Sequence, residues 1–455
     1  MKQKYMAGTL SVLLACMLWL IPALSGAEEG FRTQMPELLR FTQTMVSEEV
    51  GRDVFDQRMY PDTVNDGIDA QLRALIDDMA ARAAAFLPER GVNVSAFMDA
   101  GACISRSGDS VLSFLVLAET SVESSLTYME MDSLVYDMKT GRQLSLGDLF
   151  AADSPAWEIL SREAGRQLSE AYPAEACDAQ ALAKLCSRES LEQADFTLGA
   201  ARLTLSFRAD ALYPQKNTLL QVHVYYPEIR PLMTQYGQEQ TDNSGYRMVA
   251  LTYDDGPARK ITRKVMDELR RYGAQATFFV VGRTLRRNHD TLSRIHNSKH
   301  SIQSHTYTHT DPWELTREAA FEEKEMLRAE LSAITGLEPT MMRAPGGSEN
   351  FYIRREIGYP LIHWSLASGD SGNPHADKIA SRVIHNADDG DVILMHDINS
   401  KSPTYSRKVL EYFEENGYLC VTVEELFADA GIALEDQLVY FSPERIQVGP
   451  REDAD

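Results

Sequence analysis

Two adjacent carboxylates, Asp254 and Asp255, follow the apolar run Met248–Leu251 and precede Gly256-Pro257. Buried side by side they would repel each other, so one normally needs a cation and the other a proton or an arginine. The alternative is an Asp-Asp-Gly-Pro turn that only closes a strand. The pair alone does not decide between a catalytic centre and a turn, so the decision rests on the rest of the chain.

A second feature is the pair of histidines His305 and His309, four residues apart. In a helix or a tight turn, this spacing can present two nitrogens to one metal ion. Such a pair is weak evidence alone, because a solvated helix face explains most of them. Together with Asp255 it gives two histidines and one carboxylate, a ligand set that leaves coordination positions for water and substrate. Three nearby histidines are interpreted as surface or core residues: His289, His296 and His300.

Three further segments place polar groups directly after apolar runs. They are Arg343-Ala344-Pro345-Gly346-Gly347, Trp364-Ser365-Leu366-Ala367-Ser368-Gly369-Asp370 and Ile393-Leu394-Met395-His396-Asp397. An arginine can hold a neighbouring carboxylate in its charged form, and a Pro-Gly-Gly backbone can turn N–H groups toward an oxyanion. Sites in α/β proteins are assembled at the carboxyl ends of strands, and five such ends with polar groups are improbable by chance.

The elements that must position these groups are short apolar strands alternating with helical stretches. Strands are predicted at Val249–Tyr253, Ala276–Val281, Ile302–Gln303, Thr340–Arg343, Leu361–Ser365, Val392–Met395 and Leu419–Val423. Helices such as Arg259–Tyr272 and Thr316–Thr335 separate them. This alternation predicts an α/β fold with parallel strands and crossover helices, as an open sheet or a barrel.

The five segments, in this order, resemble the motifs of polysaccharide deacetylases of the NodB-homology type, carbohydrate esterase family 4. The similar pairs are Thr252–Pro257 with T[FY]DDGP, His305–His309 with H[ST]xxH, Arg343–Gly347 with RxPxG and Leu394–His396 with LxH. The resemblance covers roughly residues 247–430. It implies a distorted (β/α) barrel as the catalytic domain.

The resemblance also implies a role for each matching residue. The metal ligands would be Asp255, His305 and His309. The divalent metal would be Zn2+ first, with Co2+, Ni2+ or Mn2+ as alternatives. Asp254, kept ionised by Arg343, would be the base, and His396, oriented by Asp370, would be the acid. The N–H of Gly346 would donate to the oxyanion. Two more residues would contribute to substrate binding: Trp364 and Leu394.

The chain departs from the family pattern in ways that bear on the substrate. Gly346 stands where an aromatic residue is frequent, so a wall of the groove is lost. In the fourth motif, commonly DxxDW, Ala367 replaces the first Asp and Ser371 the Trp, whereas Asp370 is retained. Two polar residues stand where glycines are frequent: Lys299 and Gln303.

The length of 455 residues predicts two domains with terminal segments. Residues 1–27 have the pattern of a signal peptide, with Lys2 and Lys4 ahead of the apolar stretch Ala7–Leu24. An uncleaved anchor that tethers the protein to a membrane is the alternative. Either reading places the protein outside the cytoplasm, secreted or associated with the cell wall or membrane. A net charge of −22 argues against nucleic acid as a partner.

Residues 31–236 are predicted to form a smaller α+β accessory domain without a catalytic cluster. The segment Val135–Phe150 is similar to part of an extracytoplasmic domain found ahead of some peptidoglycan deacetylases and in anti-sigma factor sensor regions. That resemblance implies wall or partner binding, and a purely structural domain is the alternative. A helix is predicted at Asp69–Leu87 and a hairpin turn at Lys139-Thr140-Gly141 ahead of a strand at Leu144–Phe150. Residues 237–246 are predicted to be a linker and 431–455 a peripheral tail.

Four cysteines remain after the signal segment: Cys103, Cys177, Cys186 and Cys420. Outside the cytoplasm an even number permits disulfides, and Cys177 and Cys186 are close enough in sequence for a small bridge. None has the spacing of a metal site.

The sequence therefore predicts a monomeric, metal-dependent N-deacetylase acting on amino sugars of a cell-wall glycan, with peptidoglycan as the first choice. Two alternatives within enzymes are de-O-acetylation of a xylan-like polymer and deacetylation of chitin oligomers. An alternative of another class is a wall-binding or sensing protein with a decayed esterase domain.

Overall fold

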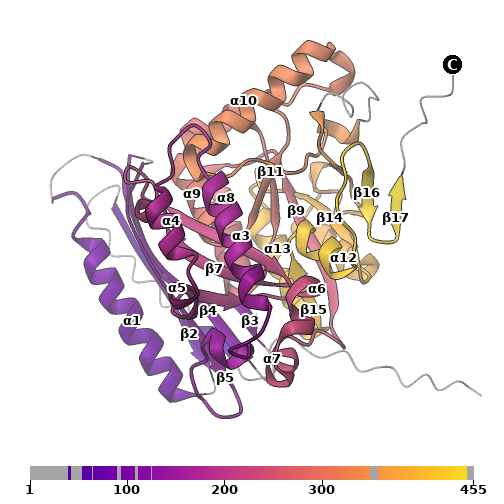
Figure 1. Ribbon diagram of the computed structural model, residues 1–455. Helices are drawn as coiled ribbons and strands as arrows, with labels where there is room; N and C mark the ends of the chain where they lie inside the picture. Colours follow the sequence, from indigo (N-terminus) through magenta and orange to yellow (C-terminus); the bar gives the residue numbers. More distant parts are fainter. Residues whose placement is uncertain are drawn as a thin grey trace, which may run out of the picture.

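The computed structural model describes residues 39–42, 54–63, 65–89, 94–107, 111–123, 125–348, 357–372 and 374–447. The predicted signal peptide or anchor lies outside the described residues. Within them, no helix is both long and apolar enough to span a bilayer. The chain forms an accessory part, up to about residue 241, followed by a barrel part (Figure 1).

The first layer of the accessory part is a five-stranded sheet in the order β1-β2-β3-β4-β5, with only β2 and β3 parallel. Its strands are β1 (Leu39–Thr42), β2 (Val54–Thr63), β3 (Ala96–Ser107), β4 (Val111–Val122) and β5 (Ser125–Asp137). Helix α1 (Asp66–Ala84) packs on one face of this sheet because Ile68, Leu72 and Ile76 recur at helical spacing. The Asn65 side chain caps the first turn of this helix. The helix begins at Asp66, three residues before its predicted start at Asp69.

The second layer of the accessory part is a three-stranded antiparallel sheet packed against helices. Its strands are β6 (Asp195–Leu198), β7 (Arg202–Arg208) and β8 (Leu219–Tyr225). Its helices are α2 (Leu146–Leu149), α3 (Ala156–Glu170), α4 (Ala179–Leu185), α5 (Arg188–Glu192), α6 (Tyr226–Ile229) and α7 (Gln235–Gln240). The four cysteines Cys103, Cys177, Cys186 and Cys420 are free thiols in the described chain, so the Cys177–Cys186 bridge is not formed.

The prediction of a strand at Leu144–Phe150 was wrong, because these residues contain helix α2. Ser145 and Asp148 form a capping box that satisfies the backbone at the start of this short helix. Leu146 and Leu149 both point into the accessory core, as the prediction of an apolar segment required. Leu146 and Leu149 are three positions apart, and this spacing indicates a helical turn rather than the alternation of a strand.

Among its described residues, the barrel part contains seven parallel strands ahead of its last hairpin. They are β9 (Arg247–Asp254), β10 (Thr277–Val280), β11 (Ser301–Ser304), β12 (Leu361–Ile362), β13 (Leu366–Ala367), β14 (Val392–His396) and β15 (Tyr418–Val421). The sheet runs β11-β10-β9-β14-β13, and β15 also pairs with β9. Single parallel bridges at Met342 connect β11 to β12. These pairings arrange the strands in a ring that has no strand pairing between β12 and β13 among the described residues, as expected for the predicted distorted (β/α) barrel, which is thus confirmed.

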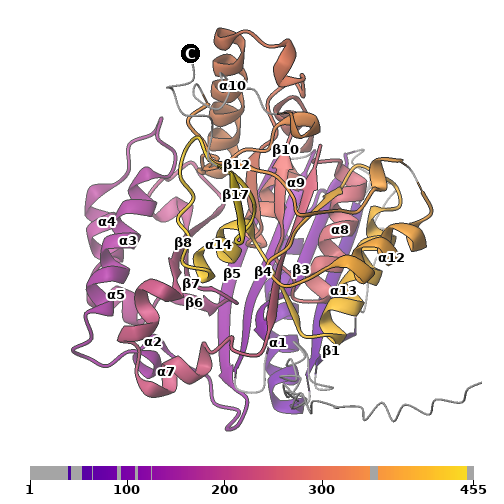
Figure 2. The same ribbon diagram turned by 90° about the vertical axis from the view of Figure 1, so that its right-hand side faces the viewer.

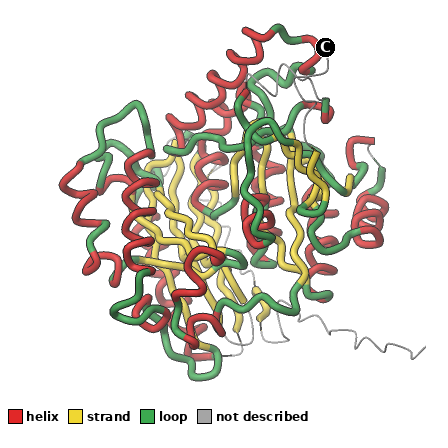
Figure 3. Tube along the Cα trace, turned by 45° about the vertical axis from the view of Figure 1, so that its right-hand side comes forward, coloured by secondary structure: helices red, strands yellow, loops and turns green. Residues whose placement is uncertain are grey.

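Helices surround this ring, whereas the strands gather in the interior of the molecule (Figure 3). The helices are α8 (Arg259–Arg271), α9 (His289–Asn297), α10 (Arg317–Thr335), α12 (Ala376–Asn386), α13 (Ser402–Glu415) and α14 (Val423–Asp429). Helix α10 projects from the body of the molecule in two perpendicular views (Figures 1 and 2). The two long predicted helices, 259–272 and 316–335, agree with α8 and α10 to within one residue at each end.

The predicted tail was wrong, because it contains a hairpin that extends the barrel sheet. Strand β16 (Val439–Ser442) pairs parallel to β12, and β17 (Arg445–Gln447) pairs antiparallel to β16. Val439 and Tyr440 are buried in two different clusters of the barrel part. The barrel part therefore extends at least to Gln447 rather than ending near residue 430.

The predicted linker, residues 237–246, is partly helical and packed. Helix α7 occupies its first half, and Gly237, Gln240 and Thr241 are buried. A Cβ at Gly237 would lie 2.7 Å from the carbonyl oxygen of Leu149, so only glycine permits this packing. The connection between the two parts is therefore folded against the accessory core.

The two parts meet through a buried polar interface centred on α9. All residues from Asp290 to Asn297 are buried. The carboxylate of Asp99 in β3 pairs with Arg270 of α8 and Arg294 of α9, each at 2.9 Å. Although burial would raise the pKa of Asp99, the two arginines hold it below its usual value. Of the three nearby histidines, His296 and His300 belong to this buried region.

Lys299 follows α9 and extends the same interface. Its backbone has a φ of 68°, in the left-handed region where glycine is favoured, which accounts for the glycine frequent in the family. Its Nζ donates to Ser105 at 2.7 Å and to Thr197, both in the accessory part. Burial lowers the pKa of this amine to about 7. A lysine at this position therefore connects the barrel part to β3 and β6 of the accessory part through its two hydrogen bonds.

Candidate active site

The carboxyl end of β9 carries the two adjacent carboxylates. Asp254 is the last residue of the strand and is buried, whereas Asp255 is partly exposed and has a φ of 75°. A left-handed conformation is uncommon for a residue with a side chain and occurs often at functional sites. The next residue, Gly256, lies so close to Asp397 that an added Cβ would be 2.3 Å from its carboxylate oxygens. This loop is therefore tightly fixed behind the two carboxylates.

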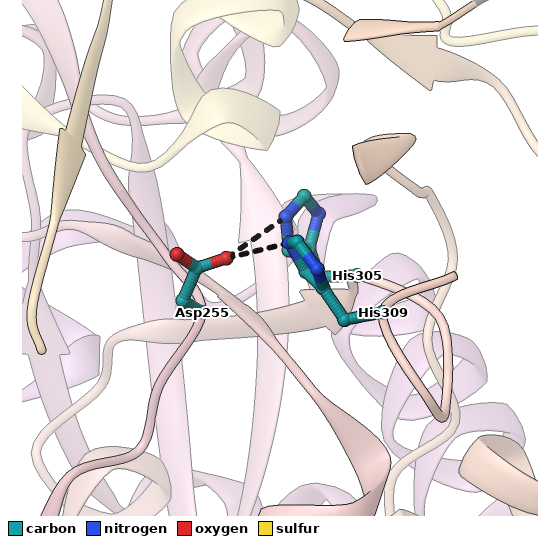
Figure 4. Close-up of side chains that lie close together, drawn as sticks. All are labelled: Asp255, His305 and His309. Atoms are coloured by element: carbon teal, nitrogen blue, oxygen red, sulfur yellow. Dashed lines mark ion pairs between the residues drawn. The ribbon is translucent and has the colours of Figure 1, made fainter. Parts of the chain in front are cut away.

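Asp255, His305 and His309 come together as the sequence predicts for a metal site (Figure 4). The Nε2 atoms of His305 and His309 lie 3.3 and 3.0 Å from Oδ1 of Asp255. One ligand atom from each residue lies within 4.8 Å of the others, and this is the one such group of three found among the described residues. The buried Oδ1 of Asp255 has no hydrogen-bond partner, as expected for an atom that a cation would satisfy.

The loop after β11 holds the two histidines through contacts with their surroundings. Nδ1 of His305 donates to the carbonyl oxygen of Arg343 at 2.7 Å, which leaves Nε2 directed at Asp255 as a ligand. Glu323 of α10 accepts the backbone N–H groups of Tyr307 and Thr308, each at 2.7 Å. Positive φ angles at Thr306 and His309 make this a tight turn rather than a helix.

Arg343 is fully buried beside Asp254. Its Nη1 donates to Oδ1 of Asp254 at 2.8 Å and to Oγ1 of Thr252 at 2.6 Å. Its other nitrogens donate to the carbonyl oxygens of Ile362 and His363. Burial lowers the pKa of this guanidinium, and the negative charge of Asp254 acts against that shift. The arginine is placed to stabilise Asp254 as a carboxylate next to Asp255.

The partly exposed His396 and the buried Asp370 form a second pair across the site. Nδ1 of His396 donates to Oδ1 of Asp370 at 2.8 Å, and its Nε2 lies 4.0 Å from Oδ2 of Asp255. Burial would lower the pKa of His396, but Asp370, with Asp254 and Asp255, raises it to about 9. The imidazole is therefore charged at neutral pH, with its free N–H facing the metal ligands.

The substrate-side residues lie around this centre. Gly346 belongs to a short 3-10 turn, Pro345–Gly347, and its N–H has no partner among the described residues, so it remains available as a donor. The Trp364 ring centroid lies 5.7 Å from the Arg343 guanidinium carbon. Leu394 is partly buried in β14 opposite Thr252. Nine of the ten predicted site residues thus lie at or just after the carboxyl ends of barrel strands, and Leu394 lies within β14.

Sequence reasoning missed three residues that support this centre. Tyr405 of α13 is buried, and its hydroxyl donates to Oδ2 of Asp370 at 2.6 Å. Glu323 holds the histidine turn. Asp397 is buried beside Gly256, and burial raises its pKa to about 7. Asp397 directly follows His396 and could have been noticed, whereas Tyr405 and Glu323 lie on helices whose patterns give no signal of a site.

Comparisons with known proteins agree with this geometry. A family model for polysaccharide deacetylase matches residues 241–360. The peptidoglycan-N-acetylglucosamine deacetylase PgdA of Listeria monocytogenes is 27% identical over 314 residues, which span 65% of this chain and 64% of that protein.

Two shorter relatives are more similar. A peptidoglycan-N-acetylglucosamine deacetylase of Bacillus cereus is 34% identical over 189 residues, 40% of this chain and 88% of that protein. A chitooligosaccharide deacetylase of Bradyrhizobium sp. is 36% identical over 163 residues, 34% of this chain and 73% of that protein. With the five motifs assembled in one barrel, these matches settle the family: the chain belongs to the polysaccharide deacetylases.

Proposed function

We propose that this protein is a metal-dependent N-deacetylase that removes acetyl groups from amino sugars of peptidoglycan outside the cytoplasm. The observation that carries the proposal is the arrangement of three groups in one site. These are the metal-ligand triad, the Asp254–Arg343 ion pair and the His396–Asp370 pair. The names of the Listeria and Bacillus cereus relatives support peptidoglycan as the substrate.

The residues divide the work of amide hydrolysis. A divalent cation held by Asp255, His305 and His309 would polarise the acetyl carbonyl and lower the pKa of water. Asp254, paired with Arg343, accepts the proton of the attacking water. The N–H of Gly346 donates to the developing oxyanion. His396 donates the proton of Nε2 to the departing nitrogen, without which an amide does not cleave readily. The products are acetate and a free amino sugar.

Zinc is the proposed cation. Two imidazole nitrogens and one carboxylate oxygen form a ligand set that zinc accepts in catalytic sites with an open position. Co2+, Ni2+ and Mn2+ accept similar ligands, so reconstitution of chelated protein with each ion, followed by assay of acetate release, would identify the active metal. The accessory part is proposed to position the barrel on the wall, and the protein to act as a monomer.

The test is mass spectrometry of peptidoglycan digests after incubation with the protein. Loss of acetyl groups from amino sugars is expected, and neither a chelator-treated sample nor Asp254→Asn should show it. Removal of a general base lowers the rate by about 10²–10⁴-fold. The matched control is Asp377→Asn, because Asp377 is an exposed aspartate paired with Lys408 and lies outside the site.

The same assay separates the remaining substrates. Acetate released from acetylated xylan, or from chitin oligomers alone, would replace peptidoglycan as the substrate while leaving the chemistry intact. If the protein bound no metal, released no acetate from any of these glycans and was unchanged by Asp254→Asn, the enzyme proposal would be wrong. The protein would then be a wall-binding or sensing module.

A further inference from the structure

The hairpin formed by β16 and β17 lies beside the active site. Strand β16 runs parallel to β12, with Ile362 opposite Tyr440, and the N–H of His363 donates to the carbonyl oxygen of Tyr440 at 2.8 Å. Phe441 is therefore next to His363, at the carboxyl end of the barrel strands. This is the end at which all the catalytic groups gather.

A continuous series of aromatic contacts joins the catalytic arginine to this hairpin. The Trp364 ring lies 5.7 Å from the guanidinium carbon of Arg343 and 5.3 Å from the His363 ring, with those two rings stacked. The rings of His363 and Phe441 lie 4.8 Å apart, and the guanidinium of Arg445 lies 4.0 Å from the Phe441 ring. All three rings are only partly buried. The outer end of this series is the cation of Arg445.

Trp364 occupies space that the third motif leaves open. A Cβ added at Gly347 would lie 2.7 Å from the Trp364 ring and 3.2 Å from the His363 ring. Gly347 also has a φ of 67°, so a side chain is excluded there for two reasons. The Pro345–Gly347 turn therefore rests against Trp364.

Arg445 lies exposed at the outer end of the series. Among the residues that the structure describes, no carboxylate pairs with it, although the chain carries 67 acidic and 45 basic residues. A guanidinium next to an aromatic face keeps its donors free for a carboxylate, which it can bind through two parallel hydrogen bonds. Partly exposed rings offer apolar faces with polar edges, which suit the C–H face of a sugar ring.

We propose that Trp364, His363, Phe441 and Arg445 form a glycan subsite that selects a carboxylate-bearing sugar near the acetamido group to be cleaved. This deepens the proposed function and rests on it for the position of that acetamido group. The rings would support one or two hexosamine units, and Arg445 would pair with the carboxylate of the outer unit. A chitin oligomer consists of hexosamine units without a carboxylate. Arg445 would therefore contribute nothing to its binding.

The test measures binding, so it does not depend on turnover. Asp254→Asn protein would be titrated with glycan strands containing lactyl carboxylates and with a chitin oligomer of equal length. Adding Phe441→Ala is expected to weaken binding of both glycans about tenfold, the scale of one lost stacking contact. Adding Arg445→Gln is expected to weaken binding of the carboxylate-bearing strand about tenfold and to leave the neutral oligomer unchanged.

Two matched controls are available in the accessory part. Phe86 is an exposed ring stacked on Tyr128 at 4.5 Å, and Arg188 lies over the Trp157 ring at 3.7 Å. Phe86→Ala and Arg188→Gln should change neither titration. Equal effects of Arg445→Gln on both glycans, or none on either, would overturn the carboxylate assignment. Unchanged binding after Phe441→Ala would overturn the subsite.

Failure of the subsite and failure of the proposed function are distinguishable. Deacetylation of peptidoglycan with no effect of Phe441→Ala or Arg445→Gln on binding would retain the enzyme and reject the subsite. Discriminating binding without acetate release from any glycan would retain the subsite and reject the enzyme. Thermal unfolding of each variant would show whether weaker binding comes from unfolding of the β16–β17 hairpin or from loss of a contact with the glycan.

Discussion

The charge on His396 depends on its carboxylate neighbour. With Asp370 bound to Nδ1, the pKa of His396 is about 9 rather than near its ordinary value of 6.5. Because the folded value is the higher one, the charged pair stabilises the fold fully below pH 6.5. That contribution is lost as the pH rises through about 9. In chelated protein, the imidazole of His396 should therefore titrate near pH 9 in an NMR titration.

Replacing the carboxylate should move this titration. Asp370→Asn removes the main cause of the raised pKa, so His396 should lose its proton at lower pH, and acetate release should fall at lower pH as well. Asp377→Asn is the control, because Asp377 pairs with Lys408 on the surface and has no contact with His396. An unchanged His396 titration in Asp370→Asn would show that another group sets the pKa.

At the scale of residues, motif positions were predictable and supporting residues were not. Asp255, His305 and His309 each lie in a short segment at a strand end, so residue type and spacing were enough to group them. Tyr405 reaches Asp370 from a helix 35 residues later, and Glu323 reaches the histidine turn from α10. In a helical pattern a buried tyrosine looks like core and a glutamate like surface, and only the fold shows their partners.

At the scale of elements, the connection from β9 to α8 depends on one glycine. A Cβ at Gly256 would lie 2.3 Å from both carboxylate oxygens of Asp397. Oδ2 of Asp397 also accepts a hydrogen bond from the Thr262 hydroxyl at 2.5 Å. Gly256→Ala should therefore displace the loop that carries Asp255. We expect a loss of about 1–3 kcal/mol in the free energy of unfolding, together with weaker metal binding. Urea denaturation and calorimetric titration of zinc would measure the two effects.

Gly165→Ala provides the comparison for this element. Gly165 lies inside α3, and a Cβ there would meet only Cys186 at 3.9 Å, an ordinary contact. The substitution should leave zinc binding unchanged and raise stability by about 0.4–1 kcal/mol. If Gly256→Ala bound zinc as tightly as the parent protein, the Asp397 side chain would be able to move away from the added methyl group. The contact between Gly256 and Asp397 would then not fix the loop.

Elements with a long repeat were predictable from the sequence, and short ones were less so. Helices α8 and α10 repeat their apolar residues over several turns, and their bounds were predicted to within one residue. Helix α2 has four residues and was taken for a strand, and β16 has four residues within a charged segment and was taken for a tail. In β16 the signal was the apolar run Val439-Tyr440-Phe441, but its pairing with β12 depends on contacts across about 80 residues of chain.

At the scale of the whole molecule, the accessory and barrel parts should unfold together. Asp99→Asn would leave Arg270 buried without its carboxylate and Arg294 with Asp267 alone, and removal of one partner of a buried ion pair costs about 3–5 kcal/mol. Calorimetry should show one transition in the parent protein and the same single transition at lower temperature in the variant. Two separate transitions in the parent protein would mean that the parts fold independently.

A surface ion pair gives the control for this effect. Asp210 pairs with Arg208 at 2.6 Å, and both side chains are exposed. Asp210→Asn should change the free energy of unfolding by less than about 1 kcal/mol, because solvent screens such pairs. A loss as large as that of Asp99→Asn would mean that burial does not set the strength of these pairs.

Two parts were predictable from length and composition, but their docking was not. The sequence pattern around 237–246 is polar and contains glycine, as linkers do, and it carries no sign that Gly237 packs on Leu149. The interface itself consists of polar residues such as Arg294, Asn297 and Lys299, which a hydrophobic pattern places in water. Their partners Asp99, Glu119 and Ser105 lie more than 100 residues away along the chain, so the burial of these three interface residues could be known only from the fold.

The burial of α9 on all sides limits how this protein can change over evolutionary time. In a barrel without a neighbour, the outer residues of such a helix face water and can be exchanged with little effect. Here the accessory sheet covers them, so a substitution on either side of the contact removes a partner from the other. Deleting the accessory part would expose Arg270 and Arg294 and remove the Asp99 carboxylate that both of them contact. Substitutions in the accessory part and in the barrel part must therefore occur together at this contact. A barrel joined to a different accessory domain would need a different sequence in α9.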